Sequence, residues 1–249
     1  MYPQRSPVQG RRVQLMLTCL CDAFYDDVAT AAVTALEHAG CEVVFPAAQT
    51  CCGQPAYTTG DWDACRRVVQ HALVVFAEDV PVVSPAGSCA AAIFHEAPIV
   101  FEGHREAPAV RALANRTWEL ADFLVNGLRV ESWPGRLQAR IAVHPGCHNR
   151  GTPTVAAAER LLGSIDGVEL VPVTDADLCC GFGGVFSVGF PHISSAMGLR
   201  KVAALMAAAP DLVVSPDMSC LLHQRGLAEH AGEKFPARHL AQVLRDALP

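Results

Sequence analysis

The cysteines of this 249-residue chain recur at nearly constant spacing, and this repeat limits the possible folds more than any other feature. The first half reads Cys-x₃₁-Cys-Cys-x₃₆-Cys and the second reads Cys-x₃₁-Cys-Cys-x₃₉-Cys, with a glycine directly after each adjacent pair. The offset in numbering is identical for the first three pairs of cysteines and slightly larger for the last, so the second half carries a small insertion. The matched pairs are Cys19 with Cys147, Cys51 with Cys179, Cys52 with Cys180, and Cys89 with Cys220. A repeat on this scale indicates one supersecondary plan used twice.

The sequence around these cysteines repeats as well. The stretch VVSPAGSC, which ends at Cys89, matches VVSPDMSC, which ends at Cys220, and ELADFLVNGL at positions 119–128 parallels RHLAQVLRDAL at 238–248. We therefore predict two domains, a first cysteine-rich repeat at residues 1–130 and a second at 131–249. Residues 129–140 contain proline and glycine, and they are the predicted linker.

Apolar periodicity predicts the same order of elements in both repeats. In the first repeat, strands are expected at residues 12–18, 41–46 and 80–85, and helices at 26–40 and 61–79. In the second, strands are expected at 140–147, 168–173 and 211–216, and helices at 154–167 and 193–209. The alternation predicts an α/β fold of two tandem pseudo-symmetric repeats, each a small parallel sheet with flanking helices. Because ligands collect beyond the carboxyl ends of such strands, we expect a Cys-lined site there in each repeat.

Composition argues against a disordered, nucleic-acid-binding, membrane-spanning or secreted protein. An apolar fraction of 51% and a charged fraction of 18% favour a folded core over disorder, and the net charge of −6 offers no basic face for nucleic acid. No stretch approaches the ~18 apolar residues of a transmembrane helix, and the first residues lack the apolar run of a signal peptide. We therefore expect a cytoplasmic protein. There, eleven cysteines favour metal binding or redox chemistry over disulfides.

Four thiolates form a soft ligand set, which selects zinc or an iron–sulfur cluster. Zinc ribbons usually supply their cysteines as two closely spaced pairs. Here single cysteines and an adjacent pair are spread over about 70 residues of each repeat, which favours a larger iron–sulfur cluster. Zinc, and buried cysteines without metal, remain the alternatives.

At these motifs the chain resembles the cysteine-rich CCG domain. That domain occurs in one of the subunits of heterodisulfide reductase and in the iron–sulfur subunits of glycolate oxidase and anaerobic glycerol-3-phosphate dehydrogenase. The whole stretch from residue 12 to 248 is similar to the lactate-utilization protein A family, whose members consist of two such domains. The similarity is carried by CCGQPAYTTG, SPAGSC, CCGFGGVFSV, DMSCLL and HLAQVL.

The resemblance implies an iron–sulfur redox subunit of an L-lactate-oxidising system that yields pyruvate, an oxidoreductase subunit of a multi-protein complex. Its implied partners are a second iron–sulfur protein and a third small protein. The implied cofactors are iron–sulfur clusters of the [4Fe-4S] type, cubane or noncubane. The ligand positions carried over, for cofactor and metal alike, are Cys19, Cys51, Cys52, Cys89, Cys147, Cys179, Cys180 and Cys220.

One departure concerns the cluster geometry. The heterodisulfide reductase type ends each motif in Cys-x-x-Cys, whereas Ala86 and Asp217 occupy the first of those places here. This puts a five-cysteine noncubane cluster in doubt and leaves a four-cysteine cube as an equal expectation. Cys21 is a candidate fifth ligand of the first site, although Asn149 stands at its counterpart.

Two other functions stay open at this point. One is a heterodisulfide-reductase-like or glycolate- or glycerol-3-phosphate-dehydrogenase-type iron–sulfur subunit. The other is a metal-stabilised assembly module without catalytic activity. No catalytic residue is assigned.

Several further residues have a functional and a structural interpretation. His144 and His148 are candidate ligands or proton donors, against a role in capping a loop. Arg150 is a candidate for binding the lactate carboxylate, against a solvated surface position. Cys41 and Cys65 are interpreted as buried structural thiols.

Overall fold

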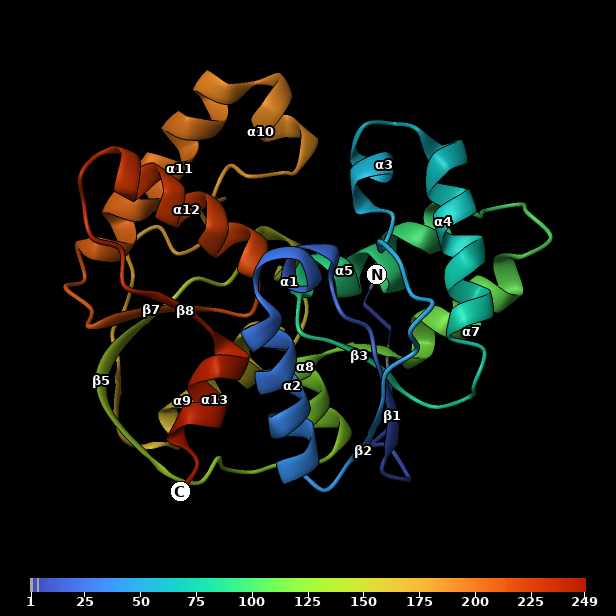
Figure 1. Ribbon diagram of the computed structural model, residues 1–249, viewed down its shortest axis with the longest axis horizontal. Coiled ribbons are helices and arrows are strands. Elements are labelled where there is room, and N and C mark those ends of the chain that lie inside the picture. Colours follow the sequence, from blue (N-terminus) through green and yellow to red (C-terminus); the bar gives the residue numbers. More distant parts are fainter. Residues whose placement is uncertain (1, 4) are drawn as a thin grey trace. The chain divides into compact units, whose positions relative to one another are not determined.

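A computed structural model describes residues 2–3 and 5–249 of the chain (Figure 1). The chain divides into two compact units, Met1–Val130 and Glu131–Pro249. None of the helices formed by the described residues has the length and apolar character of a transmembrane segment.

The first unit contains a four-stranded parallel sheet in the order β2-β1-β3-β4. In chain order its elements are β1 (Arg12–Leu15), α1 (Cys19–Phe24), α2 (Asp26–His38), β2 (Glu42–Val44), α3 (Gln54–Thr58), α4 (Trp62–Val75), β3 (Val82–Ser84), α5 (Gly87–Ala91), the π-helical η1 (Ala92–Glu96), α6 (Ala97–Val100), α7 (Ala107–Arg116), β4 (Thr117–Glu119), α8 (Leu120–Asp122) and the π-helical η2 (Phe123–Gly127).

The second unit repeats this arrangement with a parallel sheet in the order β6-β5-β7-β8. In chain order its elements are β5 (Arg136–Val143), the 3-10 turn η3 (Cys147–Asn149), α9 (Thr154–Gly163), β6 (Asp166–Leu170), α10 (Val185–Gly189), α11 (Pro191–Met206), β7 (Leu212–Ser215), α12 (Met218–His230), β8 (Ala237–His239) and α13 (Leu240–Ala247). The predicted fold class, an α/β fold of two repeats with parallel sheets and flanking helices, is confirmed.

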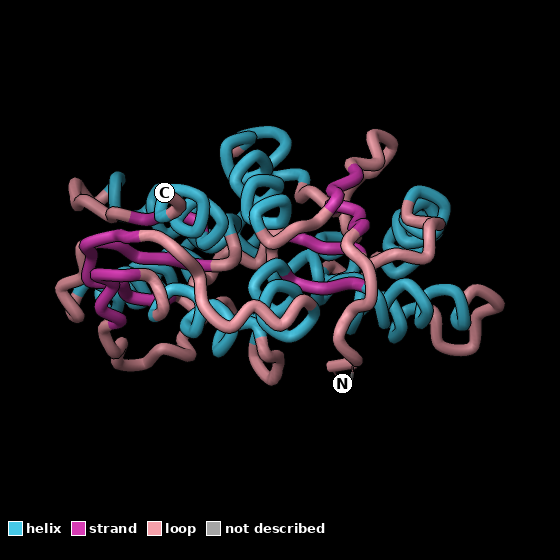
Figure 2. Tube along the Cα trace, turned by 90° about the horizontal axis from the view of Figure 1, so that it is seen from below, coloured by secondary structure: helices cyan, strands magenta, loops and turns pink. Residues whose placement is uncertain are grey.

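Burial explains why the central strands read as continuous apolar runs. Val13 and Leu15 of β1 and Val82 and Val83 of β3 are all buried, because helices cover a parallel sheet on both faces. Figure 2 shows strands with helices above and below them in the tube view. Helices such as α2 bury small alanine side chains, which allows helix and sheet to approach closely.

Two features differ from the prediction. Each sheet has a fourth strand, β4 and β8, that the pattern did not predict, because three residues are too short to show a period of two. The predicted linker is wrong in its second half, since β5 already begins at Arg136. Within the same segment, Trp133 is buried and its indole N–H donates to the carbonyl of Leu244 at 2.8 Å. The start of the second unit is therefore fixed to its own last helix.

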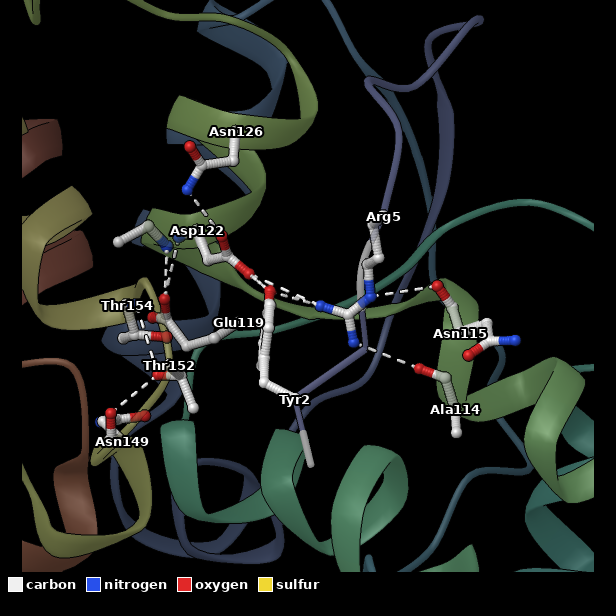
Figure 3. Close-up of polar contacts among 11 residues, drawn as sticks. Tyr2, Arg5, Ala114, Asn115, Glu119, Asp122, Asn126, Asn149, Thr152 and Thr154 are labelled. Atoms are coloured by element: carbon white, nitrogen blue, oxygen red, sulfur yellow. Dashed lines mark hydrogen bonds and ion pairs between the residues drawn. The ribbon is translucent and has the colours of Figure 1, made fainter.

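The start of the first unit is fixed by a polar network (Figure 3). Arg5 donates to the hydroxyl oxygen of Tyr2 at 2.6 Å and to the carbonyl of Asn115 at 3.0 Å. The Tyr2 hydroxyl donates to the carboxylate of Asp122, and the Arg5 guanidinium lies 4.5 Å from the ring centre of Trp118. Burial raises the pKa of Tyr2 and keeps its phenol protonated.

Candidate metal centres

The first cysteine quartet comes from three segments that leave the sheet at its carboxyl edge. Cys19 begins α1 directly after β1, and Cys89 lies on α5 after the neighbouring strand β3. Cys51 and Cys52 lie in the loop between β2 and α3. The chain turns to opposite sides of β1 at this point, because β2 pairs with one edge of β1 and β3 with the other. Such a switch point is the usual ligand position in a parallel α/β sheet.

The thiols of this quartet form a chain of contacts. Cys51 is hydrogen-bonded to Cys19 and to Cys52, and Cys52 is hydrogen-bonded to Cys89. Cys19 is exposed, and the other three are partly buried. A cavity of about 190 Å³ opens beside them, lined by Leu17, Thr18, Cys19, Asp22, Phe45, Ala47, Gln49, Thr50 and Cys51. Solvent therefore reaches the first quartet.

The second quartet has the same plan and is more deeply buried. The Sγ atoms of Cys147 and Cys179 lie 3.7 Å apart, and those of Cys180 and Cys220 lie 3.1 Å apart. Cys179 is also hydrogen-bonded to its neighbour Cys180, which completes the chain of contacts. Cys180 and Cys220 are buried, and Cys147 and Cys179 are partly buried.

Within each quartet, the pKa of one cysteine is lowered and that of its hydrogen-bond partner is raised. Hydrogen bonds from Cys19 and Cys52, supported by the backbone N–H of Gly53, lower the pKa of Cys51 to about 2. The same bond to Cys51, together with burial, raises the pKa of Cys19. Each adjacent pair thus begins with a thiolate, the form of cysteine that binds metal.

The second quartet repeats this pattern residue for residue. Hydrogen bonds from Cys147 and Cys180, and the N–H of Gly181 at 3.4 Å, lower the pKa of Cys179 to about 2. The bond to Cys179, together with burial, raises the pKa of Cys147.

The glycine after each adjacent pair has a left-handed backbone. Gly53 has a φ of +91° and Gly181 a φ of +83°, a conformation that suits glycine. It allows the N–H of each glycine to donate to the sulfur of the first cysteine of its pair, Cys51 or Cys179. A Cβ at Gly53 would lie 3.4 Å from the sulfur of Cys65, an ordinary contact. A Cβ at Gly181 would lie only 2.5 Å from the carbonyl oxygen of Ser194, so the second loop is held against α11.

The surroundings of the two quartets differ in polarity. The buried positions of α4 recur at the same spacing in α11, which aligns Lys201 with Ala72. The offsets of the cysteines themselves align three more polar residues with apolar ones. The second unit thus has His144, Lys201, Asp217 and His223 where the first unit has Met16, Ala72, Ala86 and Ala92.

Lys201 was not anticipated as part of the site. Its ammonium donates to the carbonyl of Ala176 at 2.7 Å and so fixes the loop that leads to Cys179, while burial lowers its pKa. A signal existed in the sequence, because Lys201 occupies an apolar position in the helical period of α11.

His144 is the histidine that lies within the second quartet. It follows β5, is fully buried, and its burial lowers the ring pKa to about 3, so the imidazole is neutral. Within the described residues neither ring nitrogen has a hydrogen-bond partner. Together with Cys180 and Cys220 it forms a group whose ligand atoms all lie within 4.8 Å of one another.

The remaining residues singled out in the sequence lie around the quartets. His148 places its Nδ1 3.6 Å from the sulfur of Cys147. Arg150 is exposed and donates to the carbonyl of Asp177. Cys41 and Cys65 are buried.

Cys21 is buried within α1, two residues from the exposed Cys19. Residues two apart on a helix face different directions. The helix therefore does not present Cys21 and Cys19 on one side.

Comparisons with known proteins agree with the repeat. The family model described as Cysteine-rich domain, CCG, matches residues 13–94 and 141–225. A relative from Geobacillus sp. (strain WCH70), named Lactate utilization protein A, is 40% identical over 94% of this chain and 98% of its own. Relatives of the same name from Geobacillus kaustophilus and Exiguobacterium sp. are 41% and 36% identical, over 94% and 95% of this chain and 98% of each relative.

A solved structure shares the fold. The crystal structure of a hypothetical protein from Helicobacter pylori matches with a TM-score of 0.68 at 12% identity, over 99% of this chain. The chain spans 50% of that protein's length. The family match and the clustered thiols together support a metal or iron–sulfur binding site.

Proposed function

The chain belongs to the lactate utilization protein A family, and on that premise we propose that it is an iron–sulfur redox subunit of an L-lactate-oxidising system. When lactate becomes pyruvate, two electrons and two protons leave the 2-hydroxy acid. The proposed role is to pass those electrons to an acceptor carried by the other proteins of the system. The observation that carries the proposal is the gathering of four thiols at the carboxyl edge of each sheet.

Each unit is proposed to be one CCG domain with its own centre, at residues 1–130 and 131–249. The proposed ligands of the first centre are Cys19, Cys51, Cys52 and Cys89, and those of the second are Cys147, Cys179, Cys180 and Cys220. The donor set fits, because four clustered thiols that already include a thiolate match the soft ligands of iron–sulfur clusters.

A bound cluster supplies one-electron redox chemistry, and the chain sets the conditions for it. The N–H groups of Gly53 and Gly181 donate to ligand sulfurs, an interaction that adjusts the reduction potential of a cluster. The proposed partners are a second iron–sulfur protein and a third small protein of the same system.

The experiment compares Cys52→Ser and Cys180→Ser with the unaltered chain, each co-expressed with the other proteins of its lactate system. Lactate-dependent reduction of an artificial electron acceptor and co-purification of the partners are measured together. The proposal predicts that both variants lose lactate oxidation while the partners still co-purify.

Two results would contradict the proposal. Activity that is lost only when co-purification fails would indicate an assembly module. Turnover of low-molecular-weight disulfides without any lactate oxidation would indicate a heterodisulfide-reductase-like site.

A further inference from the structure

Both ring nitrogens of His144 are buried, and neither has a hydrogen-bond partner among the described residues. An imidazole whose two nitrogens are both removed from water and unpaired costs free energy, because neither nitrogen regains the hydrogen bond that it makes to water. Buried polar side chains almost always have a partner, so an unpaired one points to a group that binds there. The main chain of His144 is satisfied, since its N–H donates to the carbonyl of Val214 at 2.8 Å. The unsatisfied atoms belong to the ring.

Two cysteine sulfurs lie within reach of the ring, which also faces the charged groups of Lys201 and Asp217. A ring nitrogen of His144 and the sulfurs of Cys180 and Cys220 all lie within 4.8 Å of one another, and the two sulfurs are 3.1 Å apart. Metal–nitrogen bonds of about 2.0–2.1 Å and metal–sulfur bonds of about 2.3 Å place nitrogen and sulfur roughly 3.6 Å apart around one tetrahedral ion. The limit of 4.8 Å on the mutual distances of these three atoms therefore includes the spacing that one metal ion requires.

The first unit lacks this arrangement. Met16 stands at the position of His144 and is buried in an apolar cluster with Val82 and Ile93. Among the described cysteines of that unit, no group of three ligand atoms lies within the same mutual range. The nitrogen donor is therefore particular to the second unit.

Two other histidines lie close to the second quartet. His223 has a hydrogen-bond partner, since its Nε2 lies 3.2 Å from the hydroxyl oxygen of Ser194. The second is His148. Its Nδ1 lies 3.6 Å from the sulfur of Cys147, and the residue is partly exposed. A hydrogen bond to one sulfur and solvent contact satisfy this ring. His144 has neither, which separates it from both of these histidines.

We propose that His144 is a nitrogen ligand of the second metal centre, which is thus bound by cysteine sulfur and one imidazole, whereas the first centre is bound by sulfur alone. The inference rests on the proposed function only in taking the second quartet as a metal site. A neutral imidazole added to the four cysteines brings a nitrogen donor without a further negative charge, and the ligand type is one of the factors that set the potential of an iron–sulfur centre. The two centres of the chain are then electronically different.

The test uses the full chain carrying Cys52→Ser, so that only the second centre loads, with its histidines labelled with ¹⁵N. The protein is reconstituted anaerobically with iron and sulfide, and pulsed EPR records the nitrogen coupling in labelled and unlabelled samples. His144→Ala is the test variant and His148→Ala is the matched control. Metal retention against a chelator is followed in parallel.

We expect a histidine nitrogen coupling that changes with the isotope, persists in His148→Ala, and is absent from His144→Ala. Metal retention in His144→Ala should be weaker by at least about tenfold. A loaded second centre without histidine coupling overturns the inference, and this result needs no variant to fold. Coupling that survives in His144→Ala also overturns it.

X-ray absorption at the metal edge separates this inference from the proposed function. A protein that takes up only zinc, with one nitrogen in the ligand shell that disappears in His144→Ala, refutes the iron–sulfur role and supports the ligand. An iron–sulfur centre with a shell of sulfur alone supports the proposed function and refutes the ligand.

Discussion

The two cysteine quartets have the same backbone plan and different neighbours. Both place an adjacent cysteine pair before a left-handed glycine, and both hold a thiolate at the first cysteine of the pair. The first quartet opens to a cavity through Cys19, whereas the second encloses Cys180 and Cys220. The comparison teaches that a repeated fold can preserve a set of ligands while the residues around them diverge in polarity and exposure.

The largest effect is expected from removing one ligand of either quartet. Cys52→Ser should abolish the first centre and leave the second, and Cys180→Ser should do the reverse, because each quartet lies within one compact unit. The measurement is metal content per chain with the EPR spectrum of each variant. A single variant that loses both centres would contradict this prediction, because it would show that one unit needs the other to bind its metal.

The glycines of the two loops should differ in their tolerance of alanine. Gly53→Ala introduces backbone strain worth about 1–2 kcal/mol, because a left-handed φ disfavours a Cβ. Gly181→Ala adds a clash with the carbonyl of Ser194, so its cost should reach about 3–5 kcal/mol. Urea unfolding of the metal-free, reduced chains measures both values.

Gly60→Ala is the control for this pair, since its φ of +79° lies close to those of Gly53 and Gly181 and its Cβ would meet no atom within 4 Å. Equal costs for Gly53→Ala and Gly181→Ala would show that the second loop is no more tightly held than the first.

Exposure should make the first centre the more labile one. The chain with Cys180→Ser keeps the exposed first centre, and the chain with Cys52→Ser keeps the buried second centre. Solvent access controls the attack of oxygen and chelators on a metal site, so the first centre should decay several-fold faster in air. The decay of visible absorption in air is measured for the two chains. Faster decay in the Cys52→Ser chain would show that the second centre is the more labile one.

The smallest effects are expected from Tyr2 and Trp133, which fix the segments that precede the first strand of each unit. Tyr2→Phe should cost about 1 kcal/mol at neutral pH, the value of one hydrogen bond to Asp122. Burial raises the folded-state pKa of Tyr2, so its contribution is complete below pH about 10 and declines above it, where the unfolded chain releases the proton.

Trp133→Phe is the counterpart in the second unit, where the indole donates to Leu244 and does not titrate. The stability difference between wild type and Tyr2→Phe should therefore shrink above pH about 10, and that between wild type and Trp133→Phe should not. Identical pH profiles would contradict the role given to the Tyr2 phenol.

The sequence was sufficient for the repeat and the parallel α/β plan, because strand and helix periods are local and the cysteine offsets are unambiguous. The short strands β4 and β8 were missed, since three residues carry no period. The proximity of His144 to Cys180 and Cys220 could not be predicted either. It depends on how the end of β5 meets a loop and the first turn of α12, segments that lie far apart in the sequence.

The metal content of the full wild-type chain after anaerobic reconstitution tests the central claim most directly. The proposal predicts iron and acid-labile sulfide bound in similar amounts at both centres, with EPR signals that Cys52→Ser and Cys180→Ser each remove in part. A folded chain that binds zinc alone, without sulfide, would contradict it.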